Sequence, residues 1–150
     1  MSHVIIRAAR EDDIPAILSL WQEAGVTPTS VTDSVEGLTL LMQEPAGLLL
    51  VSIVNDQIVG SVIGGWDGWR GNIYRLAVAP ACRRKGIARR LVQEISSALF
   101  AKGARRLSAL VEHEHPWAIK FWNSMRDLGY QRDPQFVRYI ADRKESSAKP

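Results

Sequence analysis

Cysteine is nearly absent from this chain of 150 residues: Cys82 is the only one, so no disulfide can form within a chain. No apolar run approaches the ~18 residues that a membrane-spanning helix needs, and the first residues lack the pattern of a signal peptide. There is no internal repeat and no shift in composition that would mark a second domain. We therefore expect a single domain in the reducing cytoplasm, without contact to a membrane.

An excess of one charge is also lacking, since 19 Lys and Arg residues face 16 Asp and Glu residues. The basic residues nevertheless gather in three short groups, at 83–85, 89–90 and 102–106. A local patch of this kind fits one polyanionic ligand better than a nucleic acid, which would need exposed aromatic residues among the basic ones. The composition, 46% hydrophobic and 23% charged, is that of an ordinary globular domain with a sizeable core.

The stretch 73–99 organises the rest of the chain. Its first part is apolar and predicts a strand that Pro80 ends, because proline cannot donate to a sheet ladder. Its last part predicts a helix with one buried face, from apolar residues at four-residue steps: Ile87, Leu91, Ile95 and Leu99. A short basic loop with Gly86 lies between them. Unpaired N–H groups at a helix start, beside a glycine that permits close approach, indicate a phosphate or pyrophosphate site.

The hexapeptide Arg83-Arg84-Lys85-Gly86-Ile87-Ala88 resembles the Arg/Gln-x-x-Gly-x-Gly/Ala signature of the GNAT superfamily of acetyl-CoA-dependent N-acyltransferases. Leu76-x-Val78-x-Pro80 is similar to the strand that leads into that signature. The resemblance implies an α/β fold with a mixed, mostly antiparallel central sheet of about seven strands, flanked by four helices and splayed between strands 4 and 5. Residues 1–150 would form one such domain, with 145–150 as a frayed tail.

The other elements can be placed in the family's order. A strand is expected at 4–8, a helix from about Asp12 to Gly25, and a second helix opened by a capping box of Asp33 and Glu36. Two strands at 48–54 and 58–64 would form a hairpin, followed by a loop rich in glycine and tryptophan at 64–71. The chain would end with a strand at 106–111, a helix at 116–128, and a hairpin of 130–132 and 136–141.

Contacts with coenzyme A are implied by the resemblance for the loop and the strand before it. The residues expected at the pyrophosphate are Arg83, Arg84, Lys85, Gly86, Ile87, Ala88 and Arg89. The pantetheine arm would use backbone groups of Leu76, Ala77 and Val78, with the Val78 N–H stabilising the oxyanion. His115 and Trp122, in the last helix region, are further expected contacts. Alternation along the strand predicts two sets of side chains on opposite faces, Asn72, Tyr74, Leu76 and Val78 against Ile73, Arg75 and Ala77.

Proton transfer requires a base, because an acceptor amine is mostly protonated at neutral pH. Glu112 is the residue that we place in this role, and Glu114 and Asp67 stay open as alternatives. The loop that carries Asp67 either covers an edge of the core or forms a wall of the acceptor site. No metal is expected, since histidines and glutamates that alternate at 112–115 without a distant partner are a poor ligand set.

At the position expected for the general acid the chain departs from the family, which often carries a Phe-Tyr pair in the last helix, whereas this chain has Phe121-Trp122 there. An indole N–H is not a useful proton donor. Either Tyr74 supplies the proton or the thiolate leaves without one. This departure leaves a non-catalytic acyl-CoA-binding sensor or partner module as the alternative to an enzyme.

The activity implied by the resemblance is transfer of an acetyl group from acetyl-CoA to a primary amine by direct attack, without a covalent acyl-enzyme. The acceptor is a small molecule or a peptide that the sequence does not specify, and a homodimer is left open. Neither a nucleic acid nor a membrane is expected as a partner.

Overall fold

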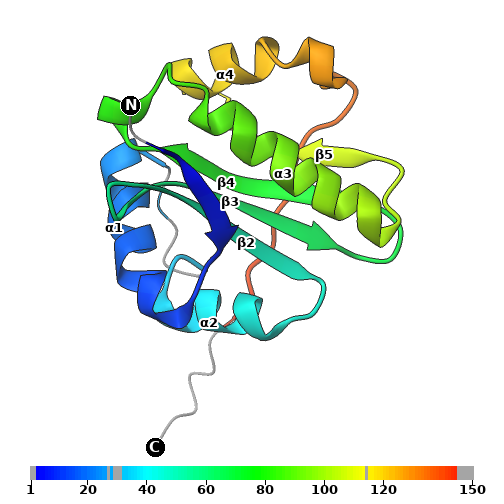
Figure 1. Cartoon of the computed structure of the whole chain (residues 1–150). Coiled ribbons are helices and arrows are strands. Elements are labelled where there is room, and N and C mark those ends of the chain that lie inside the picture. The colour runs from blue at the N-terminus through cyan, green and yellow to red at the C-terminus, as the bar shows by residue number, and fades with distance from the viewer. Residues whose placement is uncertain (1–2, 27, 29–31, 114, 145–150) are drawn as a thin grey trace, which may run out of the picture.

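The fold, taken from a computed structural model, is one mixed sheet covered by helices, described for residues 3–26, 28, 32–113 and 115–144. The elements are β1 (Ile5–Ala8), α1 (Ile14–Ala24), α2 (Val35–Gln43), β2 (Gly47–Val54), β3 (Gln57–Trp66), β4 (Gly71–Val78), α3 (Ile87–Lys102), β5 (Leu107–Ala109) and α4 (Pro116–Asn123). Short 3₁₀ helices lie at Glu11–Asp13 (η1), Pro80–Cys82 (η2) and Arg126–Leu128 (η3). The strand order is β1-β2-β3-β4-β5, antiparallel except for the parallel pair β4–β5 (Figure 1).

Helices pack on both faces of the sheet. On one face α3 lies directly on β3, where a Cβ on Gly64 would come within 2.7 Å of the Ile95 side chain. The absence of a side chain at Gly64 therefore allows the close approach of α3. On the other face the Trp21 indole of α1 donates to the Ser61 hydroxyl of β3 at 2.8 Å, and both residues are buried. Together these layers enclose one core.

The prediction of about seven strands is wrong: the described part of the sheet has five. The expected final hairpin is missing, because residues 130–144 form neither strand nor helix. Their strand-like composition is not sufficient, since a strand also needs a backbone neighbour to satisfy its N–H and C=O groups. The expected strand at 106–111 is reduced to β5, and the last helix ends at Asn123 rather than near Leu128. The expected tail at 145–150 lies outside the described residues.

The loop expected at 64–71 is also shorter than predicted. The β3 strand continues to Trp66, which pairs with Gly71 of β4, so that only a four-residue turn remains. The Asp67 carboxylate closes this turn by accepting hydrogen bonds from the N–H groups of Trp69, at 2.8 Å, and Arg70, at 2.7 Å.

The start of α2 differs from the predicted capping box. Ser34, not Asp33, is the cap, and its hydroxyl accepts a hydrogen bond from the Gly37 N–H at 3.0 Å. Asp33 instead forms an ion pair with Arg75 of β4, at 2.9 Å. The Asp33 carboxylate, which the local sequence assigned to the helix start, is therefore bound by Arg75, 42 residues further along the chain.

The predicted hairpin turn and the predicted ends of two helices are confirmed. The turn between β2 and β3 has positive φ at Asn55 (50°) and Asp56 (63°), as a tight hairpin requires. Gly25 and Gly103 end α1 and α3 in the left-handed conformation. Among the described helices, none is long and apolar enough to cross a bilayer.

Candidate functional site

The sheet opens between β4 and β5. The two strands pair only over Gly71–Ile73 and Leu107–Ala109, and one further bond joins the Leu110 N–H to the Ile73 carbonyl at 3.3 Å. Beyond that point, β3 is the only described strand beside β4. The second half of β4 therefore presents one edge of unpaired backbone, which is the splay that the family resemblance implied.

A bulge in β4 changes which side chains share a face. Arg75 has a φ of 52°. Ser61 pairs with Ala77 and Ile63 with Tyr74, so between these two pairs β4 has two residues where β3 has one. Ile73 is paired with Gly64, and Val78 with Gly60, and both glycines face α3. Ile73 and Val78 thus lie on the same face, contrary to the simple alternation, because the bulge adds one residue between them.

The backbone of Val78 is directed to the open side of β4. The next N–H, that of Ala79, donates to the Val59 carbonyl of β3 at 2.8 Å. Because successive residues of a strand direct their N–H groups to opposite sides, the Val78 N–H points away from β3 and toward the splay. The side chain of Val78 is buried. The strand thus supplies a backbone donor at the residue that the sequence singled out.

The basic loop leads into α3 with a run of backbone N–H groups that lack an acceptor within the described part of the chain. Arg84 and Gly86 have positive φ, 65° and 80°. None of the N–H groups of residues 84–89 has a hydrogen-bond acceptor among the described residues. A Cβ on Gly86 would meet no atom within 4 Å, so the loop faces open space. Several free donors at the positive end of a helix of 16 residues form a site for an anion.

The four cations predicted around this loop divide into two pairs. Arg84 and Lys85 are exposed and form no ion pair with a described residue. Arg83 turns back into the protein, where it donates to the carbonyls of Val78, at 3.2 Å, and Ala24, at 3.0 Å. Desolvation lowers the pKa of Arg83. Arg89 forms an ion pair with Asp127, so only the first two cations are available to a ligand.

The start of α4 lies beside the end of α1. His115 caps α4, since its Nδ1 accepts a hydrogen bond from the Ala118 N–H at 3.3 Å. A Cβ on Gly25 would lie 3.8 Å from the His115 Nε2. His115 therefore has a structural partner on one ring nitrogen, and the other faces the end of α1.

Trp122 packs within an aromatic cluster. Its ring meets Phe121 at 5.5 Å and Tyr130 at 5.1 Å, both edge to face. Trp117, which the sequence analysis did not single out, stacks on Phe121 at 5.6 Å and carries the Arg83 guanidinium on its ring. The signal for it was present in the sequence, as an aromatic residue one helical turn before Phe121.

The residues proposed for proton transfer lie at separate places along β4 and after β5. Tyr74 lies just before the bulge of β4, with a third of its surface exposed, and Glu112 is exposed three residues after β5. Glu114 lies outside the described residues. Asp67 is in the turn before β4, at the opposite end of that strand from the basic loop. Hydrogen bonds from the N–H groups of Arg70 and Trp69 hold the pKa of Asp67 below its ordinary value.

The remaining residues expected to contact coenzyme A lie in the second half of β4 and in the first turn of α3. Ala77 of β4 is buried, as are Ile87 and Ala88 in the first turn of α3, so only their backbone groups are available to a ligand. Leu76 is half-buried beside the bulge.

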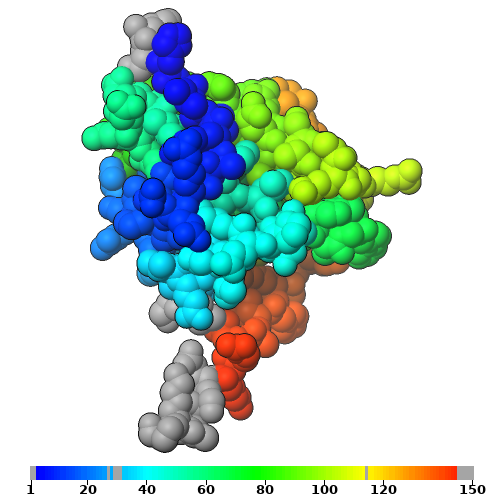
Figure 2. Space-filling view, turned by 60° about the horizontal axis from the view of Figure 1, so that its bottom comes forward, coloured from blue at the N-terminus to red at the C-terminus, as the bar shows by residue number. Residues whose placement is uncertain are grey.

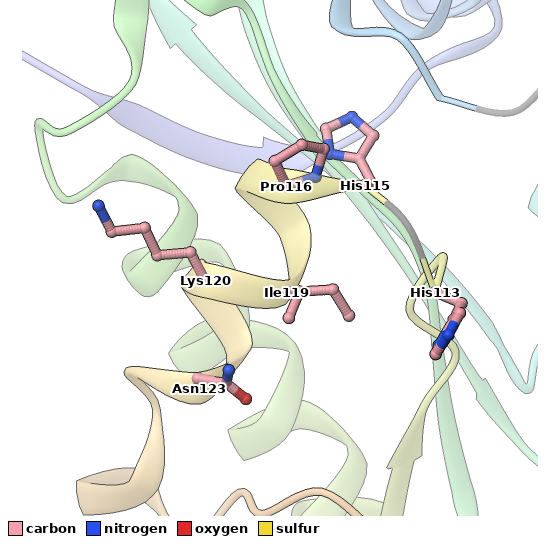
Figure 3. A pocket seen from close by; sticks show the side chains of 6 residues that line it. All are labelled: His113, His115, Pro116, Ile119, Lys120 and Asn123. Carbon is pink, nitrogen blue, oxygen red and sulfur yellow. The ribbon is translucent and has the colours of Figure 1, made fainter.

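An open pocket lies between α4 and the chain after β5. It is lined by His113, His115, Pro116, Ile119, Lys120 and Asn123. Figure 3 shows the Ile119 side chain directed toward His113, whereas Lys120 extends from the other side of the helix. Glu112 directly precedes His113 in the chain and is exposed. Within the described part of the chain, no three His, Cys, Asp or Glu residues gather as metal ligands.

The protein thus has an α/β fold, a basic loop suited to an anion at the start of α3, and an open edge on the strand before this loop. The sequence model of the Acetyltransferase (GNAT) family matches residues 9–130. An acetyltransferase of Pectobacterium atrosepticum, ECA0875, is 33% identical over 120 residues, which are 80% of this chain and 84% of the relative.

Solved structures share the fold at lower identity. A transcriptional regulator from Bacillus halodurans has a TM-score of 0.76 at 19% identity, over 93% of this chain and all of the other. The aminoglycoside N-acetyltransferase AAC(6')-Iy in complex with CoA has a TM-score of 0.73 at 16% identity, over 94% and 96% of the two chains. By fold and site the protein is an acyltransferase. The chain belongs to the Acetyltransferase (GNAT) family.

Proposed function

We propose that the protein transfers an acetyl group from acetyl-CoA to a primary amine. The observation that carries the proposal is the basic loop, where six consecutive backbone N–H groups lack an acceptor among the described residues, and two cations beside them form no ion pair there. A pyrophosphate matches this donor set in charge. The structural neighbour AAC(6')-Iy, an aminoglycoside N-acetyltransferase, was solved in complex with CoA.

The thioester of the donor supplies the activated acyl group, and the chain supplies binding and polarisation. Leu76, Ala77 and Val78 would hold the pantetheine amides along the open edge of β4. The Val78 N–H, directed into the splay, would donate to the carbonyl oxygen as negative charge develops on it. The amine nitrogen forms the new bond to the carbonyl carbon, and the carbon–sulfur bond breaks.

Two protons remain to be placed. Glu112, exposed after β5, is our candidate to take the proton from the amine, directly or through water. Tyr74, on the same strand as Val78, is the candidate to protonate the leaving thiolate. The acceptor is a small molecule or a peptide with a primary amine, and a cytoplasmic location stays a prediction.

Gly86→Asp tests the proposal. The new side chain meets no atom in the open space at Gly86, and it places a negative charge at the loop, while the left-handed φ of 80° adds backbone strain. We expect acetyl-CoA affinity to fall at least about tenfold by calorimetry, or ~1.4 kcal/mol. Gly68→Asp is the matched control, because Gly68 has a φ of 90°, faces open space and lies in the turn before β4.

An assay of thiol release with a panel of amines tests turnover. We expect release that depends on both acetyl-CoA and an amine. Binding of acetyl-CoA without release for any amine would instead support the sensor. Equal affinity in the two glycine variants would contradict the assignment of the loop.

A further inference from the structure

An exposed tryptophan stands on the turn between β3 and β4. Trp69 is 71% exposed, whereas its neighbour Trp66 packs against the core. The Asp67 carboxylate fixes the turn by accepting hydrogen bonds from the N–H groups of Trp69 and Arg70. The Asp67 N–H in turn donates to the Arg70 carbonyl at 3.3 Å. A large aromatic ring is thus held out in solvent by a closed turn.

The Arg70 guanidinium covers one face of this ring. The Cζ atom of Arg70 lies 4.3 Å from the ring centre, where the electrons of an indole attract a cation. Since Trp69 remains 71% exposed, the other face of the ring is open. The Arg70 side chain donates no hydrogen bond to a described residue, so its N–H groups stay available. The pair therefore offers a flat stacking surface beside a positive charge.

Further cations lie next to this turn, at the end of α3 and in the segment that leads to β5. The Gly71 N–H donates to the Arg106 carbonyl at 3.1 Å, so the two segments are in direct contact. Arg105 and Arg106 are exposed, and neither side chain binds a described residue. Lys102, also exposed, donates to the Pro45 carbonyl at 3.3 Å. Figures 1 and 2 show the end of α3 beside the turn that precedes β4.

The positive charge in this region is not balanced by acidic residues. Asp67 is the only acidic residue within 60–76 and 95–111, and the N–H groups of the turn occupy its carboxylate. The same two stretches contain five cations, of which Arg75 alone forms an ion pair with a described residue. An excess of positive charge therefore surrounds the open face of the tryptophan. We call the following residues the aromatic–basic patch: Trp69, Arg70, Lys102, Arg105 and Arg106.

The aromatic–basic patch is separate from the basic loop. The loop precedes α3 and the patch lies at the end of this helix, which with 16 residues is about 24 Å long. Likewise, the turn with Trp69 precedes β4, whereas the basic loop follows it. No residue of the patch is among the expected contacts with coenzyme A or the groups proposed for proton transfer. The patch is therefore a second surface, and its role does not depend on acetyl transfer.

We propose that the aromatic–basic patch binds single-stranded nucleic acid, with an unpaired base stacked on the open face of Trp69 and phosphates held by the surrounding cations. Aromatic rings among basic side chains hold bases and phosphates together, with little regard to sequence. From the sequence a nucleic acid was not expected, because it needs exposed aromatic residues among the basic ones. The fold supplies one, since it brings the turn with Trp69 to Arg106, 37 residues further along the chain.

Other polyanionic partners fit this patch less well. A membrane-binding surface inserts several apolar side chains, and a stable protein interface buries about 800 Å² per partner around an apolar core. Within 60–71 and 95–106, the large apolar side chains that are exposed are Trp69 and Phe100, the latter 52% exposed in the last turn of α3. An unpaired base needs only one ring face, which Trp69 provides.

Fluorescence anisotropy with a labelled oligo(U) of about 12 nucleotides tests the stacking. Trp69→Ala should weaken binding at least about fivefold, because stacking on one base is lost. The circular dichroism spectrum should stay unchanged, since the side chain is exposed. Trp69→Phe keeps a ring and should restore most of the affinity. Tyr139→Ala is the matched control, because Tyr139 is 91% exposed and lies outside the patch.

The salt dependence of oligo(U) binding tests the phosphate contacts. Arg105→Gln combined with Arg106→Gln should weaken binding and reduce the slope of log affinity against log salt by about 1.4, as the loss of two phosphate contacts does. Arg84→Gln combined with Lys85→Gln removes the same charge at the basic loop, at a distance that salt screens. This second pair should leave the affinity for oligo(U) within about twofold.

Two further probes separate the nucleic acid from a general polyanion. Oligo(dT) distinguishes DNA from RNA, and binding of either strand supports the proposal. Polyglutamate of equal charge has no bases and should compete poorly. Absence of oligonucleotide binding, unchanged affinity in Trp69→Ala, equal competition by polyglutamate, or a larger loss in the Arg84 and Lys85 pair than in the Arg105 and Arg106 pair would each overturn the proposal. Calorimetry with acetyl-CoA on Trp69→Ala, where unchanged affinity is expected, keeps this outcome separate from the proposed function.

Discussion

The guanidinium of Arg83 lies 4.6 Å from the centre of the Trp117 ring. The same guanidinium donates to the carbonyls of Ala24 and Val78. One side chain therefore joins the end of α1, the end of β4 and the start of α4. Arg83, the first residue of the family signature, is therefore engaged within the protein, whereas its neighbours Arg84 and Lys85 are exposed and are the cations that we propose for the ligand.

Arg83→Ala should destabilise the fold. Two hydrogen bonds from a charged donor and the packing on Trp117 are lost, so we expect the free energy of unfolding to fall by about 1–3 kcal/mol in urea titrations. Arg84→Ala is the control, because Arg84 is exposed and should change stability by no more than ~0.5 kcal/mol. Acetyl-CoA affinity should drop severalfold in Arg84→Ala. Equal stability of the two variants would contradict this division of roles.

Glu112→Gln should lower kcat/KM at least about tenfold and remove its rise with pH, while the affinity for acetyl-CoA stays unchanged. Asp67→Asn is the control. Its carboxylate is held ionised by two N–H groups in a turn at the other end of β4, so its loss should leave kcat/KM within about twofold. A fully active Glu112→Gln would transfer the role to Glu114 or to water alone.

Trp122→Tyr restores the residue that the family often has. Trp122 packs between Phe121 and Tyr130, and tyrosine can keep part of that contact. Because a CoA thiolate is a tolerable leaving group, we expect kcat to change by less than about tenfold. An inactive unmodified protein with an active Trp122→Tyr variant would show that the acid is needed and that this chain has lost it.

Asp13→Asn should make stability less dependent on pH in the acid range. The Asp13 carboxylate accepts hydrogen bonds from Arg7, which lower its pKa in the folded state. A lowered folded pKa stabilises the protein above the unfolded value of ~3.9, and this stabilisation is lost as the pH falls through the folded value. The difference from the unmodified protein, about 1 kcal/mol at pH 7, should therefore disappear at low pH. A constant difference from pH 7 to pH 3 would exclude this linkage.

The sequence was sufficient wherever a signal is local. Gly25 and Gly103 end helices because only glycine adopts the required φ without strain, and Asn55-Asp56 makes a hairpin turn for a similar reason. The basic loop was found in the same way, from a strand, a proline, a glycine and a helix in order. For each of these features the cause lies within a few residues of the effect.

Features that depend on distant residues were missed. Asp33 was assigned to the start of α2 because its partner Arg75 lies on another element. The bulge at Arg75 contains no glycine that would indicate it in the sequence. The prediction of which β4 side chains share a face was therefore incorrect. The predicted strand ended at Gly64, and residues 65 and 66 were assigned to the loop, whereas β3 continues to Trp66. The apolar pattern at 136–141 was recognised, but whether a strand forms there depends on a neighbour that the sequence does not supply.

The parallel pairing of β4 with β5 is only three residues long, and its two strands are separated in the chain by the whole of α3. Short contacts that close long loops are the first to open when a protein fluctuates. Besides this short pairing, side chains from before and within α3 hold the last third of the chain, among them Arg83, Arg89 and Ser96. A donor bound across the splay would bridge this weak junction. Stability against heat should then rise with the logarithm of acetyl-CoA concentration above its Kd, so that the supply of substrate sets how long the folded enzyme lasts.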